Sequence, residues 1–138
     1  MKKIRAAVVG YGNIGQYTLQ ALEVAPDFEV AGIVRRQGAK EKPLELEQYD
    51  VVSDIAELHD VDVAILALPT RECPTYAKKY LAMGINTVDS FDIHSGIVNY
   101  RAELMPVCKE HGRVSVISAG WDPGSDSIVR MLMQSLAP

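Results

Sequence analysis

The chain has 138 residues, of which 48% are hydrophobic and 23% charged, as is typical of one soluble globular domain. The formal net charge of −4 argues against nucleic-acid binding, and no apolar run is long enough to span a membrane. Two cysteines, Cys73 and Cys108, form no disulfide framework, and the histidines show no metal-ligand spacing, so no metal site is predicted. The apolar part of the N-terminus is too short for a signal peptide, and we expect a cytoplasmic protein.

The start of the chain predicts a strand, a glycine-rich turn and a helix. "IRAAVV" (4–9) is typical of a buried strand, and larger apolar residues recur at helical spacing over 14–25. Between them, Gly10, Gly12 and Gly15 form the pattern G-x-G-x-x-G. In this context the pattern predicts a dinucleotide-binding loop. Gly10 would allow a tight turn, Gly12 would let a pyrophosphate come close to the backbone, and Gly15 would let the helix pack against the strand. A turn with positive φ and no ligand is the alternative.

The residues after the second predicted strand indicate which dinucleotide is bound. "FEVAGIV" (28–34) is followed by Arg35 and Arg36, where an NAD site usually carries an acidic residue. A guanidinium can pair with a 2′-phosphate and stack on adenine. The pair therefore favours NADP over NAD, although two solvated surface arginines would look the same in sequence.

The remaining chain predicts alternating strands and helices. A polar surface loop is expected over 37–48, and Asp54 with Glu57 forms a capping box for a short helix over 54–58. Helix 98–112 is expected to be started or interrupted by Pro106. The further predicted strands are 49–54, 61–68, 85–90 and 113–118, and the further predicted helices lie within 69–84 and 127–138.

Six strands alternating with helices predict an α/β fold, a doubly wound parallel sheet of the Rossmann type, in the order 3-2-1-4-5-6. Ligands of such sheets bind at the carboxyl ends of the strands. The loops that follow the strands are therefore the places where functional side chains are expected.

Two of these loops are rich in polar groups. "TVDSFDIH" (87–94) carries Asp89, Asp92 and His94, and "SAGWDPG" (118–124) carries tryptophan and aspartate between glycines. Carboxylates there could hold a substrate ammonium group or accept a proton, and the tryptophan could wall a pocket. Turn and cap chemistry is the alternative for each acidic residue, and we expect His94 to be a loop or cap residue.

Four segments together, "VVGYGNIG", "VRRQ", "TVDSFDIH" and "SAGWDPGSDS", resemble the amino-terminal half of the meso-diaminopimelate dehydrogenases. The last two segments are much more specific than the glycine motif, which many dehydrogenases share. The resemblance covers nearly the whole chain. It implies reversible, NADP-dependent oxidative deamination of meso-2,6-diaminopimelate at its D-centre to L-2-amino-6-oxopimelate, in bacterial lysine and cell-wall precursor synthesis.

The resemblance also implies roles for individual residues. Asp92 and Asp122 would be catalytic, and with Trp121 they would bind the substrate. The implied cofactor-binding residues are Gly10, Tyr11, Gly12, Asn13, Ile14, Gly15, Arg35, Arg36, Gln37, Leu68, Pro69, Thr70, Ser90, Phe91, Ala119 and Gly120. Family members run to roughly twice this length, in line with a second domain of ordinary size. We therefore expect residues 1–138 to be the dinucleotide-binding domain of a longer, homodimeric enzyme.

Two other functions are weighed against this one. The first is another NADP-dependent oxidoreductase of related fold, similar to dihydrodipicolinate reductase or to the sugar dehydrogenases. A sugar-type enzyme would be expected to carry a Lys–Pro pair after the fifth strand, which "VDSFDIH" lacks. The second is a nucleotide-sensing regulatory domain, which would need no acidic loops.

Overall fold

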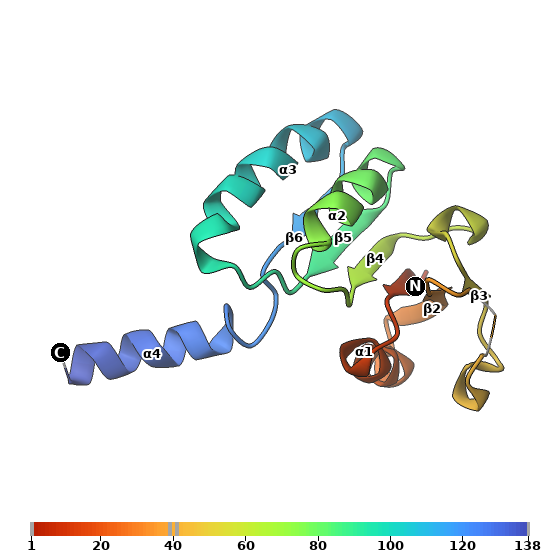
Figure 1. Ribbon diagram of the computed structural model, residues 1–138, viewed down its shortest axis with the longest axis horizontal. Helices are drawn as coiled ribbons and strands as arrows, with labels where there is room; N and C mark the ends of the chain where they lie inside the picture. Colours follow the sequence, from red (N-terminus) through yellow and green to blue (C-terminus); the bar gives the residue numbers. More distant parts are fainter. Residues whose placement is uncertain (1, 39, 41, 138) are drawn as a thin grey trace.

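The centre of the molecule is a parallel β-sheet, shown by a computed structural model that describes residues 2–38, 40 and 42–137. The described part contains six strands in the spatial order β3-β2-β1-β4-β5-β6, so the predicted order is confirmed (Figure 1). The strands are β1 (Ile4–Val9), β2 (Phe28–Val34), β3 (Val51–Val52), β4 (Val63–Leu66), β5 (Asn86–Asp89) and β6 (Ser115–Val116).

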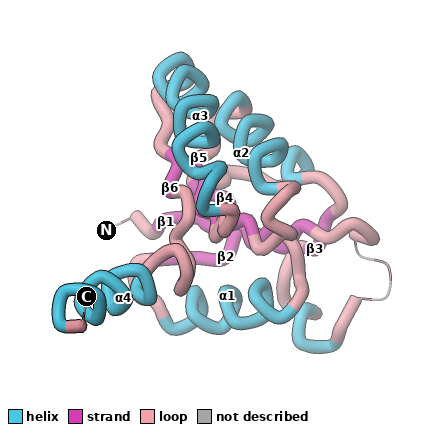
Figure 2. The backbone as a smooth tube through the Cα atoms, turned by 60° about the vertical axis from the view of Figure 1, so that its left-hand side comes forward, coloured by secondary structure: helices cyan, strands magenta, loops and turns pink. Residues whose placement is uncertain are grey.

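Helices cover both faces of this sheet, as a doubly wound fold requires. Figure 2 shows α1 (Asn13–Val24) on one side of the strands and α2 (Cys73–Ala82) with α3 (Ile97–His111) on the other. The helix α4 (Ser125–Leu136) follows β6. Three short 3-10 turns complete the described elements: η1 (Leu44–Leu46), η2 (Ile55–Glu57) and η3 (His94–Gly96).

Strand β1 is apolar and buried from Ala6 to Val9 because this part of it faces a hydrophobic core on each side of the sheet. Ala6 and Val8 belong to the core under α1, with Leu19 among its members. Ala7 and Val9 belong to the core under α2 and α3, with Tyr80 among its members. Since successive strand residues point to opposite faces, a continuous apolar run is what this central strand needs.

Some predicted elements differ from those in the structure. Helix α3 is neither started nor interrupted by Pro106, which lies inside it. Pro106 and Ala102 are both exposed, so water can satisfy the carbonyl group that the missing proline N–H leaves without its helical partner. The loop over 37–48 is not entirely at the surface, because Leu46 of η1 is fully buried in the core under α1. Within that loop, residues 39 and 41 lie outside the described part.

The short helix over 54–58 was predicted correctly at its start. Oδ1 of Asp54 accepts a hydrogen bond from the backbone N–H of Ala56 at 3.0 Å, and Oε1 of Glu57 accepts one from the N–H of Asp54 at 2.9 Å. The predicted capping box is therefore confirmed, although the helix it starts is a single 3-10 turn.

Helix α4 extends away from the rest of the molecule (Figure 1). No residue of α4 is buried, and the exposed fraction of Leu136 reaches 85%. Its other strongly exposed apolar residues are Ile128, Val129, Met131, Leu132 and Met133. The predicted end of this helix at Pro138 lies outside the described residues. Among those residues, no helix combines the length and the apolar character needed to cross a membrane.

Candidate dinucleotide-binding site

The glycine-rich loop joins the end of β1 to the start of α1, and its glycines are required by the backbone geometry. Gly10 has a φ of +94°, and a Cβ atom there would lie 2.4 Å from the carbonyl oxygen of Ala67. A Cβ atom on Gly15 would lie 2.1 Å from the carbonyl oxygen of Gly10. Around Gly12, by contrast, a Cβ atom would meet nothing within 4 Å. The predicted tight turn and close helix packing are confirmed, and the loop is open at Gly12.

A cleft of about 530 Å³ lies at the carboxyl edge of the sheet, where β1, β2 and β4 end. It brings the glycine-rich loop together with the arginine pair, although the two segments are separated in sequence by all of α1 and β2. Of the predicted cofactor-binding residues, the cleft is lined by Gly10, Tyr11, Gly12, Arg35, Arg36, Gln37, Leu68 and Pro69.

The other predicted cofactor-binding residues do not line this cleft. Asn13 and Ile14 are exposed in the first turn of α1, where N–H groups at the positive end of a helix suit a phosphate. Phe91 is only 5% exposed and packs on Tyr100, so its side chain belongs to the core. The remaining members of this group are Gly15, Thr70, Ser90, Ala119 and Gly120.

The sequence did not predict the other residues that line the cleft, which are the strand-end residues Val9, Val34 and Ala67 and the polar residues Ser53, Glu72 and Tyr76. Ser53 directly follows β3, and its place after a strand was a signal that could have found it. Glu72 and Tyr76 belong to the loop after β4 and to α2, and nothing in the local sequence shows that they reach the cleft. An ion pair joins Nη2 of Arg36 to Oε1 of Glu72 at 3.6 Å.

The glycine-rich loop itself carries one phenol, that of Tyr11. Burial, followed by the neighbouring Glu45 carboxylate, raises the pKa of Tyr11 above its ordinary value. The Tyr11 hydroxyl therefore stays protonated at neutral pH and can donate a hydrogen bond.

The loop after β5 is anchored by Asp89, which is only 2% exposed. Its Oδ1 accepts hydrogen bonds from the backbone N–H groups of Phe91 at 2.9 Å and Ser118 at 3.1 Å. Its Oδ2 accepts one from the hydroxyl of Tyr100 at 2.7 Å. Of the two roles considered for Asp89, the structure supports the structural one, because three donors already occupy the carboxylate.

The two predicted substrate-binding carboxylates have different surroundings. Asp92 is exposed, and its backbone N–H donates to Oγ1 of Thr70 at 3.0 Å. Asp122 pairs through Oδ1 with Arg130 of α4 and, at 3.3 Å, with Nε2 of His94. His94 lies in the short turn η3 of the loop after β5, and Asp122 is a partner of its side chain there. Trp121 is 72% exposed, so its indole does not belong to the core.

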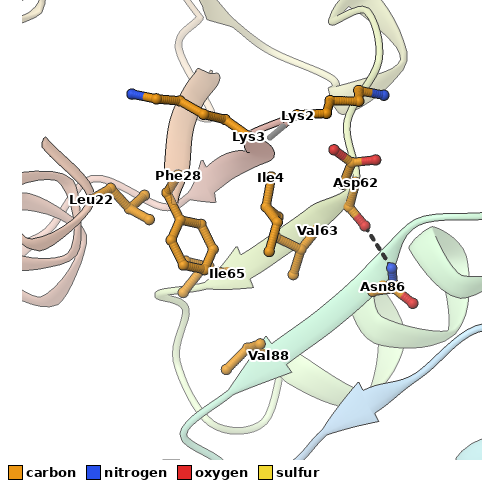
Figure 3. Close-up of a pocket in the computed structure, with 10 residues that line it drawn as sticks. All are labelled: Lys2, Lys3, Ile4, Leu22, Phe28, Asp62, Val63, Ile65, Asn86 and Val88. Atoms are coloured by element: carbon orange, nitrogen blue, oxygen red, sulfur yellow. Dashed lines mark hydrogen bonds between the residues drawn. The ribbon is translucent and has the colours of Figure 1, made fainter. Parts of the chain in front are cut away.

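A second cavity, of about 560 Å³, opens at the other edge of the sheet (Figure 3). Its lining residues are Lys2, Lys3, Ile4, Leu22, Phe28, Asp62, Val63, Ile65, Asn86 and Val88. Most of them lie at or near the amino ends of strands, whereas parallel sheets of this kind bind ligands at the carboxyl ends. We therefore take the first cleft as the candidate dinucleotide site. Nowhere in the described ranges do three or more His, Cys, Asp or Glu side chains gather as a metal ion would need.

A parallel sheet of this order, with a glycine-rich loop lining a cleft at its carboxyl edge, defines a Rossmann-type dinucleotide-binding domain. The chain belongs to the oxidoreductase family with an NAD-binding Rossmann fold, whose model matches residues 4–88.

Comparison with known proteins confirms the resemblance noted in the sequence. Over its whole length, the chain is 68% identical to a meso-diaminopimelate D-dehydrogenase of Bacteroides fragilis, of which it covers 46%. It is 33% identical to the enzyme of the same name from Ureibacillus thermosphaericus, of which it covers 43%. The chain therefore spans less than half the length of these relatives.

Two solved structures are similar over nearly all of the chain. One is an engineered D-amino acid dehydrogenase bound to NADP⁺, with a TM-score of 0.80 and 31% identity. The match covers 98% of this chain and 42% of that one. The other is the diaminopimelate dehydrogenase of Corynebacterium glutamicum in complex with diaminopimelate, with a TM-score of 0.79 and 32% identity. That match covers 99% of this chain and 42% of the other.

Proposed function

We propose that this chain is the NADP(H)-binding part of a meso-diaminopimelate dehydrogenase. The observation that carries the proposal is the cleft that unites the glycine-rich loop with Arg35 and Arg36. The open space at Gly12 leaves room for a pyrophosphate, and the exposed start of α1 presents backbone N–H groups beside it.

The arginine pair is what favours NADP(H) over NAD(H) in this proposal. Arg35 and Arg36 line the cleft directly after β2, the strand end that faces the adenosine ribose in this fold. Their guanidinium groups can pair with the two charges of a 2′-phosphate. Gln37 lies beside them and can donate a further hydrogen bond.

The proposed reaction is the reversible oxidative deamination of meso-2,6-diaminopimelate at its D-centre to L-2-amino-6-oxopimelate. The names of the relatives and the complex of one of them with diaminopimelate support this substrate. The bound nicotinamide would supply the hydride acceptor, and the protein would supply position and charge.

The acidic loops would hold the reacting centre of the substrate. Asp92 is exposed, and Asp122 is partly exposed, so both carboxylates can be reached by a substrate ammonium group. Arg130 and His94 already orient the Asp122 side chain through Oδ1, which leaves lone pairs of Oδ2 to accept a hydrogen bond. Trp121, which is mostly exposed, would cover the substrate and exclude water.

The proposal extends to the whole protein. We propose that the native polypeptide continues past residue 138 into a second domain with substrate and homodimer contacts, and that it acts in the cytoplasm in lysine biosynthesis. The greater length of the relatives supports this, and so do the exposed apolar residues of α4. An intact mass of the native protein near 15.1 kDa would contradict it.

Calorimetric titration with NADPH and then NADH tests cofactor binding, and turnover of meso-diaminopimelate by the native-length protein tests the reaction. We expect tighter binding of NADPH and a rise in NADPH absorbance when NADP⁺ and meso-diaminopimelate are mixed with the enzyme. Binding without turnover of this substrate would instead support the nucleotide-sensing alternative or a different oxidoreductase.

A further inference from the structure

One ion pair connects the two walls of the candidate dinucleotide-binding cleft. Arg36 follows β2, Glu72 immediately precedes α2, and both side chains line the cleft. Nη2 of Arg36 lies 3.6 Å from Oε1 of Glu72. The guanidinium proposed to receive a 2′-phosphate therefore already has an anionic partner inside the protein.

The position of Glu72 indicates that this contact is not a by-product of helix capping. Glu72 occupies the N-cap position of α2, yet its side chain makes no capping hydrogen bond. Its carboxylate is directed to Arg36 instead. The pair is also weak, because the Arg36 side chain is 89% exposed and Glu72 is 37% exposed. A stronger ligand for the guanidinium can therefore displace Glu72.

We propose that Glu72 is a specificity-determining residue that competes with the 2′-phosphate of NADP(H) for Arg36. This inference rests on the proposed function. A phosphate forms stronger charge-assisted hydrogen bonds with a guanidinium than a singly charged, exposed carboxylate does. Binding of the 2′-phosphate then has to break the contact between Glu72 and Arg36, so Glu72 weakens NADP(H) binding without affecting NAD(H).

The substitution Glu72→Gln tests this inference, because it removes the charge and keeps the size of the side chain. We expect E72Q in the native-length protein to bind NADP⁺ about two- to fivefold more tightly, the range that an exposed ion pair supports. Binding of NAD⁺ should stay unchanged. If the 2′-phosphate is the group concerned, E72Q should bind the fragment 2′,5′-ADP more tightly than the wild type does, as with NADP⁺. Its affinity for 5′-AMP, which lacks the 2′-phosphate, should be unchanged, as with NAD⁺.

Two further variants separate this effect from a general change in charge. Glu103→Gln removes an equally negative group from α3, where Glu103 pairs with Lys78 outside the cleft. It should leave both affinities unchanged. In an Arg36→Gln background, the E72Q substitution should lose most of its effect, since the guanidinium that Glu72 contacts has been removed.

The possible outcomes distinguish the inference from the function on which it rests. Unchanged or weaker NADP⁺ binding by E72Q would overturn the inference, and so would an equal effect of E72Q with and without Arg36. If the wild type and E103Q also fail to bind NADP⁺, the proposed function itself is wrong, and the inference falls with it.

Discussion

The hydroxyl of Tyr100 in α3 donates a hydrogen bond to Oδ2 of Asp89 at the end of β5, over 2.7 Å. The other oxygen of the same carboxylate accepts a hydrogen bond from the backbone N–H of Ser118, in the loop after β6. One buried side chain thus ties together the two loops that carry the predicted substrate-binding residues. The geometry of those loops therefore depends on a residue that is itself buried.

Replacing Tyr100 with phenylalanine should destabilise the protein. Tyr100→Phe leaves one oxygen of the buried Asp89 carboxylate without its partner, at a cost of about 1–3 kcal/mol in unfolding free energy. Urea unfolding followed by circular dichroism measures the change. Tyr17→Phe is the matched control, because Tyr17 is 68% exposed and should show no change. Equal stability of Y100F and wild type would contradict the role given to Asp89.

Stability should also fall in alkaline solution because of buried tyrosines. Burial, followed by the hydrogen bond to Asp89, raises the pKa of Tyr100, and burial raises the pKa of Tyr80. The unfolded state, whose tyrosines ionise near pH 10, therefore gives up these protons first. The contribution of these tyrosines to the unfolding free energy should be constant below that pH and decrease above it, and Y100F should show a smaller decrease. The same alkaline slope in Y100F and wild type would argue against this assignment.

Removal of both cleft arginines should weaken NADPH binding selectively. The double substitution Arg35→Ala and Arg36→Ala should raise the Kd for NADPH about ten- to a hundredfold, since hydrogen bonds to a charged phosphate are lost. The Kd for NADH should change much less. Isothermal titration measures both, with Arg101→Ala on α3 as the control outside this cleft. An unchanged preference between the two cofactors would exclude these arginines as the 2′-phosphate site.

Neutralising either substrate carboxylate should lower turnover. Asp122→Asn and Asp92→Asn should each reduce kcat of the native-length protein with meso-diaminopimelate about tenfold or more, because a positioned charge or proton acceptor is lost. Asp27→Asn, an exposed change before β2 at the opposite edge of the sheet, serves as the control. Kinetics near those of the wild type in both D92N and D122N would remove these two residues from the mechanism.

The two cysteines should differ in reactivity. Burial, followed by the negative charge of Asp89, raises the pKa of the Cys73 thiol to about 12, and Cys73 is fully buried. Cys108 is partly exposed. A maleimide at neutral pH should therefore label Cys108 in the folded protein, while Cys73 should react only after denaturation. Mass spectrometry of the labelled peptides measures the difference, and rapid labelling of Cys73 in the native state would contradict its buried position.

Local patterns were enough wherever one segment determines its own conformation. The strand over 4–9, the tight turn at Gly10, the close helix packing at Gly15 and the capping box at Asp54 were predicted, and the structure confirms each of them. The strand order also followed from the alternation of strands and helices. Prediction was poorer where tertiary contacts determine the conformation. Helix α3 continues through Pro106 because that part of the helix is exposed to water. Leu46 is buried because α1 and the sheet pack around it.

The sequence by itself determined the elements of this protein, their parallel order, and the loops that meet at the carboxyl edge, because hydrophobic periodicity and glycine placement are local properties. Only the tertiary structure decided which side chains of those loops meet. It paired His94 with Asp122, and Glu72 with Arg36, across many residues of chain. It also used Asp89 as a buried anchor. Such pairings depend on how separate elements pack together, and the spacing of residues along the sequence does not predict them.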